Sequence, residues 1–298
     1  MRVALATCAV LPRADADLPL LIDAFGRRGV TAEAAVWDDP AIAWRDFDAV
    51  IVRSTWDYVE KFEAFARWID ATARATRLLN DAPILRWNLH KRYLLELAAR
   101  GVDIVPTTLL EAGNEADWAG LFARHGDLVL KPAVSAGSFA TIRVHAGDAE
   151  TARRHRQAHI GRDFLVQPLL RSVVEHGETN LVCFDGRPSH AIHKGARWSG
   201  ESEQSRGLVE PSAGELALAE RAHAAVRALG LGVPIYARVD CAAGPDGLPL
   251  LMELELLEPS LFLDRSPRSA ALLANGVIAR TWRITRDSLE EAEFRPIG

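Results

Sequence analysis

Hydrophobic and polar positions follow two rhythms in the N-terminal third of the chain. The apolar run at residues 3–11 (VALATCAVL) predicts a buried strand, and residues 32–37 (AEAAVW) and 48–55 (DAVIVRST) predict further strands. Two other segments, 17–29 and 61–69, repeat apolar side chains at the spacing of a helix. The helical positions that we expect to be buried are Leu18, Leu21, Ile22, Phe25, Phe62, Phe65, Ala66 and Ile69.

This alternation of strands and helices predicts an α/β domain with a mostly parallel sheet, whose ligands gather at the carboxyl ends of the strands. The segment RSTWDY, residues 53–58, lies at such an end. It has two interpretations: a polar helix cap followed by a packing tryptophan, or an exposed loop that faces a substrate. In the second interpretation the substrate residues are Ser54, Thr55, Trp56 and Tyr58.

The pattern then changes to longer helices and antiparallel strands. The segment RWNLHKRYLLELAARG, residues 86–101, predicts a helix, and the strands LVLKPA (128–133) and FLVQPLL (164–170) bracket a small unit. We therefore expect an N-terminal α/β domain, a linker helix that begins the second part of the chain, a small lobe, and a C-terminal lobe that carries a metal site. These parts span residues 1–86, 87–126, 127–170 and 171–298.

Composition limits the class of protein. The 298 residues are 49% hydrophobic and 25% charged, as expected for a globular protein of two or three lobes. The formal net charge of -5 gives no basic face for nucleic acid, and charges interrupt every apolar run before it could cross a membrane. The opening MRVALATCAVLP is better explained as a buried strand than as a signal peptide, and the scattered Cys8, Cys183 and Cys241 predict reduced, buried thiols in a cytoplasmic protein.

Lysine is rare, because only four of the 35 basic residues are lysines. Lys61 lies on the polar side of a predicted helix and is expected at the surface. Lys91, Lys131 and Lys194 remain, and an ammonium group is a compact charge that fits against a phosphate oxygen. The loop PAVSAGSFAT, residues 132–141, directly follows Lys131 and could bring backbone N–H groups close to phosphate, although most such loops are simple turns.

Carboxylates stand in the leucine-rich run LMELELLEPSLFL, residues 251–263. We expect its strand to pair with PIYARVDC (234–241) across the turn GPDG, with Met252 and the leucines pointing into the core. The opposite face of the hairpin then carries Arg238, Asp240, Glu253 and Glu255. Carboxylate and phosphate oxygens together describe a magnesium site that holds a nucleotide, but an ion-pair ladder around Arg238 explains the pattern equally well.

The lysines, the small-residue loop and the carboxylates together imply a nucleoside triphosphate. Glu178, with Glu175 nearby, could accept hydrogen bonds from the ribose hydroxyls. The backbone of residues 166–170 (VQPLL) could meet the edge of an adenine between two lobes.

The order Lys, Lys-Pro, small-residue loop, Gln hinge, Gly-Glu, Arg-x-Asp and Glu-x-Glu resembles that of the ATP-grasp ligases over nearly the whole chain. The resemblance implies the ATP-grasp fold, in which a Rossmann-like domain with a parallel sheet is followed by two α+β lobes that clamp ATP. In these ligases a substrate carboxylate is phosphorylated to an acyl phosphate, which a nucleophile then attacks.

The resemblance implies ATP and Mg²⁺ as cofactors, with two magnesium ions expected and Mn²⁺ as the alternative. The residues that would bind ATP are Lys91, Lys131, Ser135, Gly137, Ser138, Gln167, Pro168, Leu169, Leu170, Glu175 and Glu178. The metal ligands would be Asp240, Glu253 and Glu255, and the catalytic residues Arg238 and Lys194. Arg238 would neutralise charge on the transferred phosphoryl group or the tetrahedral intermediate. The family motif commonly reads Glu-x-Asn, so Glu255 departs from it and could turn to an arginine such as Arg265.

The stretches RSTWDY and ELELLEPSLFL are similar to a narrower group of ATP-grasp proteins, which contains the O-ureido-serine cyclo-ligase of D-cycloserine formation. This similarity implies cyclisation of O-ureido-D-serine to the antibiotic D-cycloserine, with release of ADP and phosphate. It also places Ser260 where the superfamily often holds a substrate carboxylate.

Two other functions stay open. One is an intermolecular ligase for an amino acid or peptide, and the other is a nucleotide-binding regulatory protein without turnover. The expected partner is an amino-acid-like small molecule, with no nucleic acid and no membrane, and a homodimer is one option for the assembly.

Overall fold

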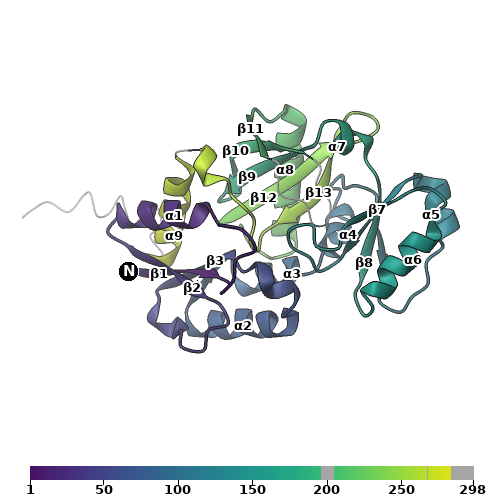
Figure 1. The fold of residues 1–298 in the computed structure, drawn as a ribbon. Helices are drawn as coiled ribbons and strands as arrows, with labels where there is room; N and C mark the ends of the chain where they lie inside the picture. Colours follow the sequence, from purple (N-terminus) through teal and green to yellow (C-terminus); the bar gives the residue numbers. More distant parts are fainter. Residues whose placement is uncertain (196–204, 267, 283–298) are drawn as a thin grey trace, which may run out of the picture.

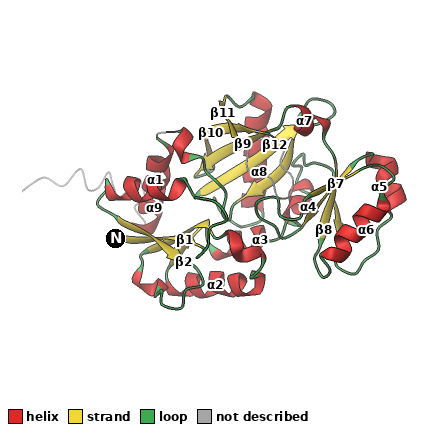
Figure 2. Cartoon of the chain, viewed as in Figure 1, coloured by secondary structure: helices red, strands yellow, loops and turns green. Residues whose placement is uncertain are grey.

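Three β-sheets form the protein, as seen in a computed structural model that describes residues 1–195, 205–266 and 268–282. Figure 1 shows the N-terminal sheet at one end, the small sheet at the other and the largest sheet between them. Helices lie against each sheet (Figure 2) and close hydrophobic cores with it. One parallel sheet followed by two antiparallel sheets agrees with the parallel-sheet domain and the two α+β lobes that the sequence predicts.

The N-terminal sheet has four parallel strands in the order β2-β1-β3-β4. They are β1 (Arg2–Thr7), β2 (Thr31–Val36), β3 (Ala49–Ser54) and β4 (Arg77–Leu79). On one face lie α1 (Asp17–Gly26) and the distant α9 (Ser269–Trp282), and on the other lies α2 (Phe62–Ala75). Two 3-10 turns, η1 (Trp44–Asp46) and η2 (Trp56–Val59), flank β3.

The small sheet has four antiparallel strands in the order β5-β8-β6-β7. They are β5 (Thr108–Leu110), β6 (Leu128–Pro132), β7 (Ile142–Val144) and β8 (Phe164–Pro168). Helices α5 (Trp118–His125) and α6 (Ala149–Ala158) close its core. Each begins after an aspartate, Asp117 or Asp148, whose side chain accepts a hydrogen bond from the first turn.

The large sheet has five antiparallel strands in the order β11-β10-β9-β12-β13. They are β9 (Glu178–Phe184), β10 (Arg187–Lys194), β11 (Ser205–Val209), β12 (Tyr236–Ala243) and β13 (Pro249–Glu255). Helix α8 (Ala213–Ala228) packs on one face and begins with a capping box between Ser212 and Glu215. The short helix α7 (Arg171–Glu175) precedes β9, and the 3-10 turn η3 (Leu263–Arg265) follows β13.

The segment 86–101 is not the single helix that its pattern predicts. The structure has two short helices, α3 (Ala82–Asn88) and α4 (Tyr93–Ala98), and Lys91 lies in the break between them. Polar side chains on both sides of the break bind the edge strand β13. Asn88 Nδ2 donates to Leu254 O at 2.8 Å, and Tyr93 Oη accepts from Leu254 N at 3.0 Å, so the edge of the large sheet is covered.

Two smaller differences from prediction concern the N-terminal domain. Ile22 is 38% exposed on α1 rather than buried, and the first strand ends at Thr7, before the end of its apolar run. The three cysteines are buried and free, as predicted. Within the described ranges, every helix is too short or too polar to cross a lipid bilayer.

Candidate active site

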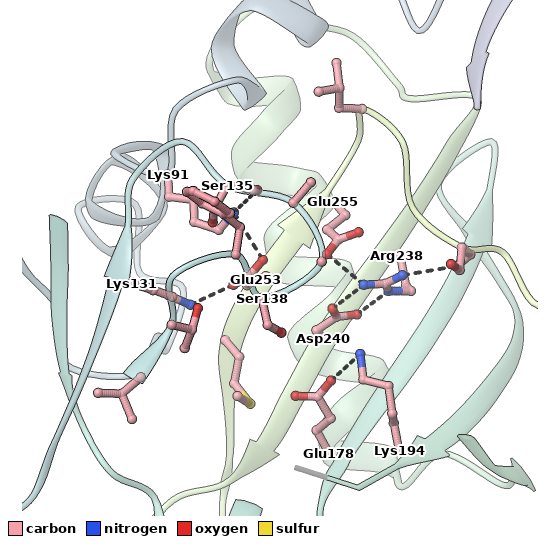
Figure 3. Close-up of a pocket in the computed structure, with 18 of the residues that line it drawn as sticks. Lys91, Lys131, Ser135, Ser138, Glu178, Lys194, Arg238, Asp240, Glu253 and Glu255 are labelled. Carbon is pink, nitrogen blue, oxygen red and sulfur yellow. Dashed lines mark hydrogen bonds and ion pairs between the residues drawn. The ribbon is translucent and has the colours of Figure 1, made fainter. Parts of the chain in front are cut away.

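A cavity of about 900 Å³ is lined by residues from all three sheets and their loops. The large sheet contributes side chains from β9, β10, β12 and β13, and the small sheet contributes β6 and β8. The N-terminal domain contributes the loops after β1 and β3. Figure 3 shows that the charged side chains of the large sheet, together with Lys91 and Lys131, point towards one another.

The hairpin of β12 and β13 forms as predicted. Arg238 lies opposite Glu255 and Asp240 lies opposite Glu253, and all four side chains line the cavity. The register shifts after Asp240 because β13 carries one extra residue at this point. Met252 therefore lines the cavity, contrary to the predicted alternation.

Glu253 lies between two lysines. Its carboxylate is 2.7 Å from Lys131 Nζ and 3.5 Å from Lys91 Nζ. Burial by itself raises the pKa of Glu253, but the two lysines outweigh burial and hold the pKa below its ordinary value. The fourth lysine, Lys61, lies at the surface as predicted, with 43% of its side chain exposed.

Arg238 contacts the other two carboxylates of the hairpin. Its Nε and Nη2 donate to the two oxygens of Asp240 at 2.7 and 2.8 Å, and Nη2 lies 2.7 Å from Glu255. Arg265, the predicted alternative partner of Glu255, pairs with Asp264 instead. Burial and the nearby Asp240 raise the pKa of Glu255 to about 8, against the lowering effect of Arg238. The carboxylates that form these ion pairs are therefore the same ones that the magnesium interpretation of the sequence assigns as metal ligands.

Lys194 and Glu178 lie on neighbouring strands, β10 and β9, with their side chains 2.7 Å apart. Burial raises the pKa of Glu178, but Lys194 lowers it, and the net change is a decrease. Glu175 does not line the cavity, contrary to its predicted role. It lies at the end of α7, 4.0 Å from Arg171, with 53% of its side chain exposed, whereas Glu178 lines the cavity.

The small-residue loop lines the cavity with Ser135, Gly137 and Ser138. Lys91 Nζ donates to Ser135 O at 2.9 Å, which connects the loop to the break between α3 and α4 (Figure 3). Gly137 and Ser138 have φ angles of 59° and 61°, so the loop passes through the left-handed region at its centre. The predicted adenine hinge, residues 167–170, also lines the cavity.

The predicted substrate residues fall into two groups. Ser54 and Thr55 are fully buried and do not line the cavity, so their predicted exposure is wrong. Ser54 still belongs to the parallel sheet, where its Oγ shares a hydrogen bond with Thr7 Oγ1 at 2.9 Å. Trp56 and Tyr58 do line the cavity, and so does Ser260 from the far end of the chain.

Arg13 and Glu258 line the cavity although neither was predicted to do so. Arg13 Nη2 donates to Ser260 Oγ at 2.9 Å, and its guanidinium carbon lies 4.7 Å from the centre of the Trp56 ring. The sequence does contain a signal for Arg13, because this residue follows a strand of a parallel sheet. Ligands gather at the carboxyl ends of such strands, and the same rule selects Trp56. Glu258 lies beyond the end of β13, where strand alternation no longer predicts direction.

The chemistry of the hairpin carboxylates fits magnesium, because Asp240, Glu253 and Glu255 offer hard oxygen donors to one cavity. In the part of the chain that the structure describes, no three acidic, histidine or cysteine side chains already converge as ligands of a single ion. Each of the three carboxylates instead faces lysine or arginine. Their metal-binding roles therefore stay predictions.

Comparisons with known proteins find relatives over nearly the whole chain. The family model for the N-terminal domain of D-cycloserine synthetase DcsG matches residues 3–80. The cycloserine biosynthesis protein DcsG of Streptomyces lavendulae is 38% identical over 296 residues, which cover 93% of this chain and 98% of that protein.

Solved structures give the same result. The crystal structure of D-cycloserine synthetase DcsG aligns at a TM-score of 0.86 and 37% identity, over 94% of this chain and 100% of that one. A RimK domain ATP-grasp protein from Sphaerobacter thermophilus shares the fold at a TM-score of 0.65 and 22% identity, over 93% and 99% of the two chains. The chain therefore belongs to the D-cycloserine synthetase family of ATP-grasp ligases.

Proposed function

We propose that this enzyme uses ATP to close O-ureido-D-serine into the five-membered ring of D-cycloserine. The substrate carboxylate takes the terminal phosphoryl group of ATP, and ADP leaves. The nitrogen bonded to the side-chain oxygen then attacks the acyl phosphate, and phosphate leaves. The ring nitrogen still carries the carbamoyl group, whose hydrolysis consumes one water molecule and releases carbon dioxide and ammonia.

The observation that carries this proposal is the similarity to the cycloserine biosynthesis protein DcsG, at 38% identity over 93% of this chain. The cavity supports the proposal independently of that similarity. It gathers lysines, a small-residue loop and carboxylates from different elements, as phosphoryl transfer to a small carboxylate substrate requires.

On the ATP side, Lys91 and Lys131 are proposed to contact the phosphates, residues 167–170 the adenine, and Glu178 the ribose. Lys91 and Lys131 both contact Glu253, so the phosphate-binding and metal-binding groups adjoin one another. Magnesium, when bound to Asp240, Glu253 and Glu255, supplies positive charge that neutralises the triphosphate. Two ions, with manganese as the alternative, are part of the proposal.

On the substrate side, Arg238 is proposed to stabilise negative charge on the acyl group, with Lys194 as a second cation. Arg238 is suited to this role because Asp240 holds its guanidinium through two hydrogen bonds, so the donor is oriented before the substrate arrives. Arg238 Nη1 also donates to Ser260 O at 3.2 Å, which places the proposed carboxylate-binding serine beside it.

We expect the reaction to take place in the cytoplasm, where ATP is available. The three free, buried thiols agree with a reducing compartment. The homodimer stays a prediction.

Mass spectrometry combined with assays of ADP and ammonia tests the proposal. The purified enzyme is incubated with magnesium-ATP and O-ureido-D-serine, and in parallel with the L-form, free D-serine or dipeptide precursors. We expect ADP and ammonia in equal amounts and a product with the mass of D-cycloserine. ADP release that needs a second amine would identify an intermolecular ligase, and ATP binding without ADP release would favour a regulatory protein.

A further inference from the structure

Glu258 differs from the other carboxylates of the cavity in its partners. Four carboxylates, on Glu178, Asp240, Glu253 and Glu255, each lie 2.7 Å from a lysine or arginine nitrogen. Glu258 also lines the cavity and is only 9% exposed, but no lysine, arginine or histidine within the described ranges forms an ion pair with it. The uncharged phenol of Tyr58 lies close to its side chain.

The backbone around Glu258 is fixed from both sides. Trp56 Nε1 donates to Glu258 O at 3.3 Å, and Arg53 Nη2 donates to Pro259 O at 2.8 Å. Tyr58 is buried, and its hydroxyl also lies 3.3 Å from Ser135 O. The carboxylate is therefore held at the wall of the cavity that the N-terminal domain provides.

A buried carboxylate that forms no ion pair loses hydration without a direct counterion to replace it, so a cation from a ligand would bind there favourably. Burial raises the pKa of Glu258, and the more distant charges of Lys91, Arg238 and Arg53 offset this increase only in part. The hairpin carboxylates that fit magnesium lie on β12 and β13, whereas Glu258 lies beyond β13, where Trp56 Nε1 donates to its backbone oxygen.

We propose that Glu258 binds the α-ammonium group of the substrate, with Tyr58 as the positioning residue that orients its carboxylate. This inference rests on the proposed function, because it takes the substrate to be an amino acid whose own carboxylate is activated. The ammonium and carboxylate groups of an amino acid share one carbon atom. A fixed contact to the ammonium, together with Arg238 and Ser260 near the carboxylate, therefore selects one orientation and one enantiomer.

The variant Glu258→Gln keeps the shape of the side chain and removes its charge. We expect the KM for O-ureido-D-serine to rise about 10- to 100-fold, because the variant loses a charge-assisted hydrogen bond. The KM for ATP and the magnesium requirement should stay unchanged. Glu60→Gln, at the exposed end of the same turn that carries Tyr58, is the matched control and should behave like the wild type.

A second substrate separates recognition from structure. 3-(Carbamoylaminooxy)propanoic acid lacks only the ammonium group, so Glu258→Gln should use it about as well as the wild type does. Tyr58→Phe, which keeps the ring, should show a smaller KM increase with O-ureido-D-serine and little change with the deamino compound. Equal losses with both compounds, or a shifted magnesium requirement, would overturn the assignment of Glu258.

If the proposed function is wrong, the wild-type enzyme will show no activity with O-ureido-D-serine, and this result is distinct from a failure of the Glu258 assignment. In that case a panel of D- and L-amino acids is screened for one that stimulates ADP release. The KM of Glu258→Gln relative to that of the wild type is then measured for this amino acid and for its deamino analogue. Stimulation only by carboxylates that lack an ammonium group, or by no member of the panel, would overturn the Glu258 assignment as well.

Discussion

Charged side chains that share one cavity are distinguished here by their partners. Glu253 faces two lysines, whereas Asp240 and Glu255 share Arg238. Each pair offsets the cost of burial with charge-assisted hydrogen bonds, which is why acids can stand in a leucine-rich run. The roles proposed for these residues can therefore be tested by removing one charge at a time.

Replacement of Glu253 by glutamine should lower the rate of ADP release by about 100-fold or more. The amide has nearly the shape of the carboxylate, but it offers no anionic oxygen to magnesium and no counterion to Lys131. The circular dichroism spectrum should stay that of the wild type, because the core leucines are untouched. A rate close to that of the wild type would remove Glu253 from the metal site.

Replacement of Lys131 by alanine should raise the KM for ATP about tenfold or more, because a buried cation proposed to meet the phosphates is lost. Lys61→Ala is the matched control, since that lysine is exposed and lies outside the cavity. Steady-state kinetics at varied ATP concentration makes the comparison. An equal KM in the two variants would contradict a phosphate contact for Lys131.

At the scale of elements, short-range patterns predict more than long-range contacts do. The hairpin of β12 and β13 could be predicted because alternation and one tight turn set its register locally. The extra residue that turns Met252 into the cavity has no such signal. The break between α3 and α4 also could not be predicted, because Asn88 finds its partner 166 residues away on β13.

Helix α8 carries a titratable group that the sequence did not single out. His223 is buried against the large sheet, and neither ring nitrogen has a hydrogen-bond partner in the described part of the chain. Burial lowers the pKa of His223 from 6.5 to about 4. Between these values the unfolded chain binds more protons than the folded one, so stability is full above pH 6.5 and decreases as the pH falls towards 4.

The variant His223→Leu should therefore lose less stability on acidification than the wild type. At pH 5 this histidine accounts for a loss of roughly 2 kcal/mol relative to neutral pH. Differential scanning calorimetry at pH 7.5 and pH 5 measures the difference in melting temperature for each protein. Equal decreases in the two proteins would mean that His223 contributes nothing to acid sensitivity.

At the scale of the whole molecule, a buried ion pair connects the N-terminal sheet to the loop that carries Glu258. Asp17 on α1 lies 3.3 Å from Arg53 on β3, and its oxygens accept hydrogen bonds from Leu261 N and Leu263 N at 2.7 and 2.8 Å. No sequence pattern predicts this contact, because its members come from opposite ends of the chain. It explains how residues after β13 reach the same cavity as Trp56.

The variant Asp17→Asn should destabilise the protein by roughly 3 kcal/mol, because it leaves Arg53 buried without its counterion. It should also raise the KM for the amino-acid substrate more than the KM for ATP, because the loop it holds carries Ser260 and Glu258. Asp23→Asn, on the exposed side of the same helix, is the control. Urea unfolding and steady-state kinetics test both effects, and a variant as stable as Asp23→Asn would contradict this account.

The shared core beneath α1 affects how the chain can fold during its synthesis. Leu21 and Phe25 of α1 belong to the same cluster as Leu273 and Val277 of α9. When the four parallel strands have left the ribosome, one face of their sheet is covered by α1 but still lacks α9. That face waits for about 190 further residues, which take roughly ten to forty seconds to make. The solubility of the growing chain in this interval therefore depends on a helix that has not yet been translated.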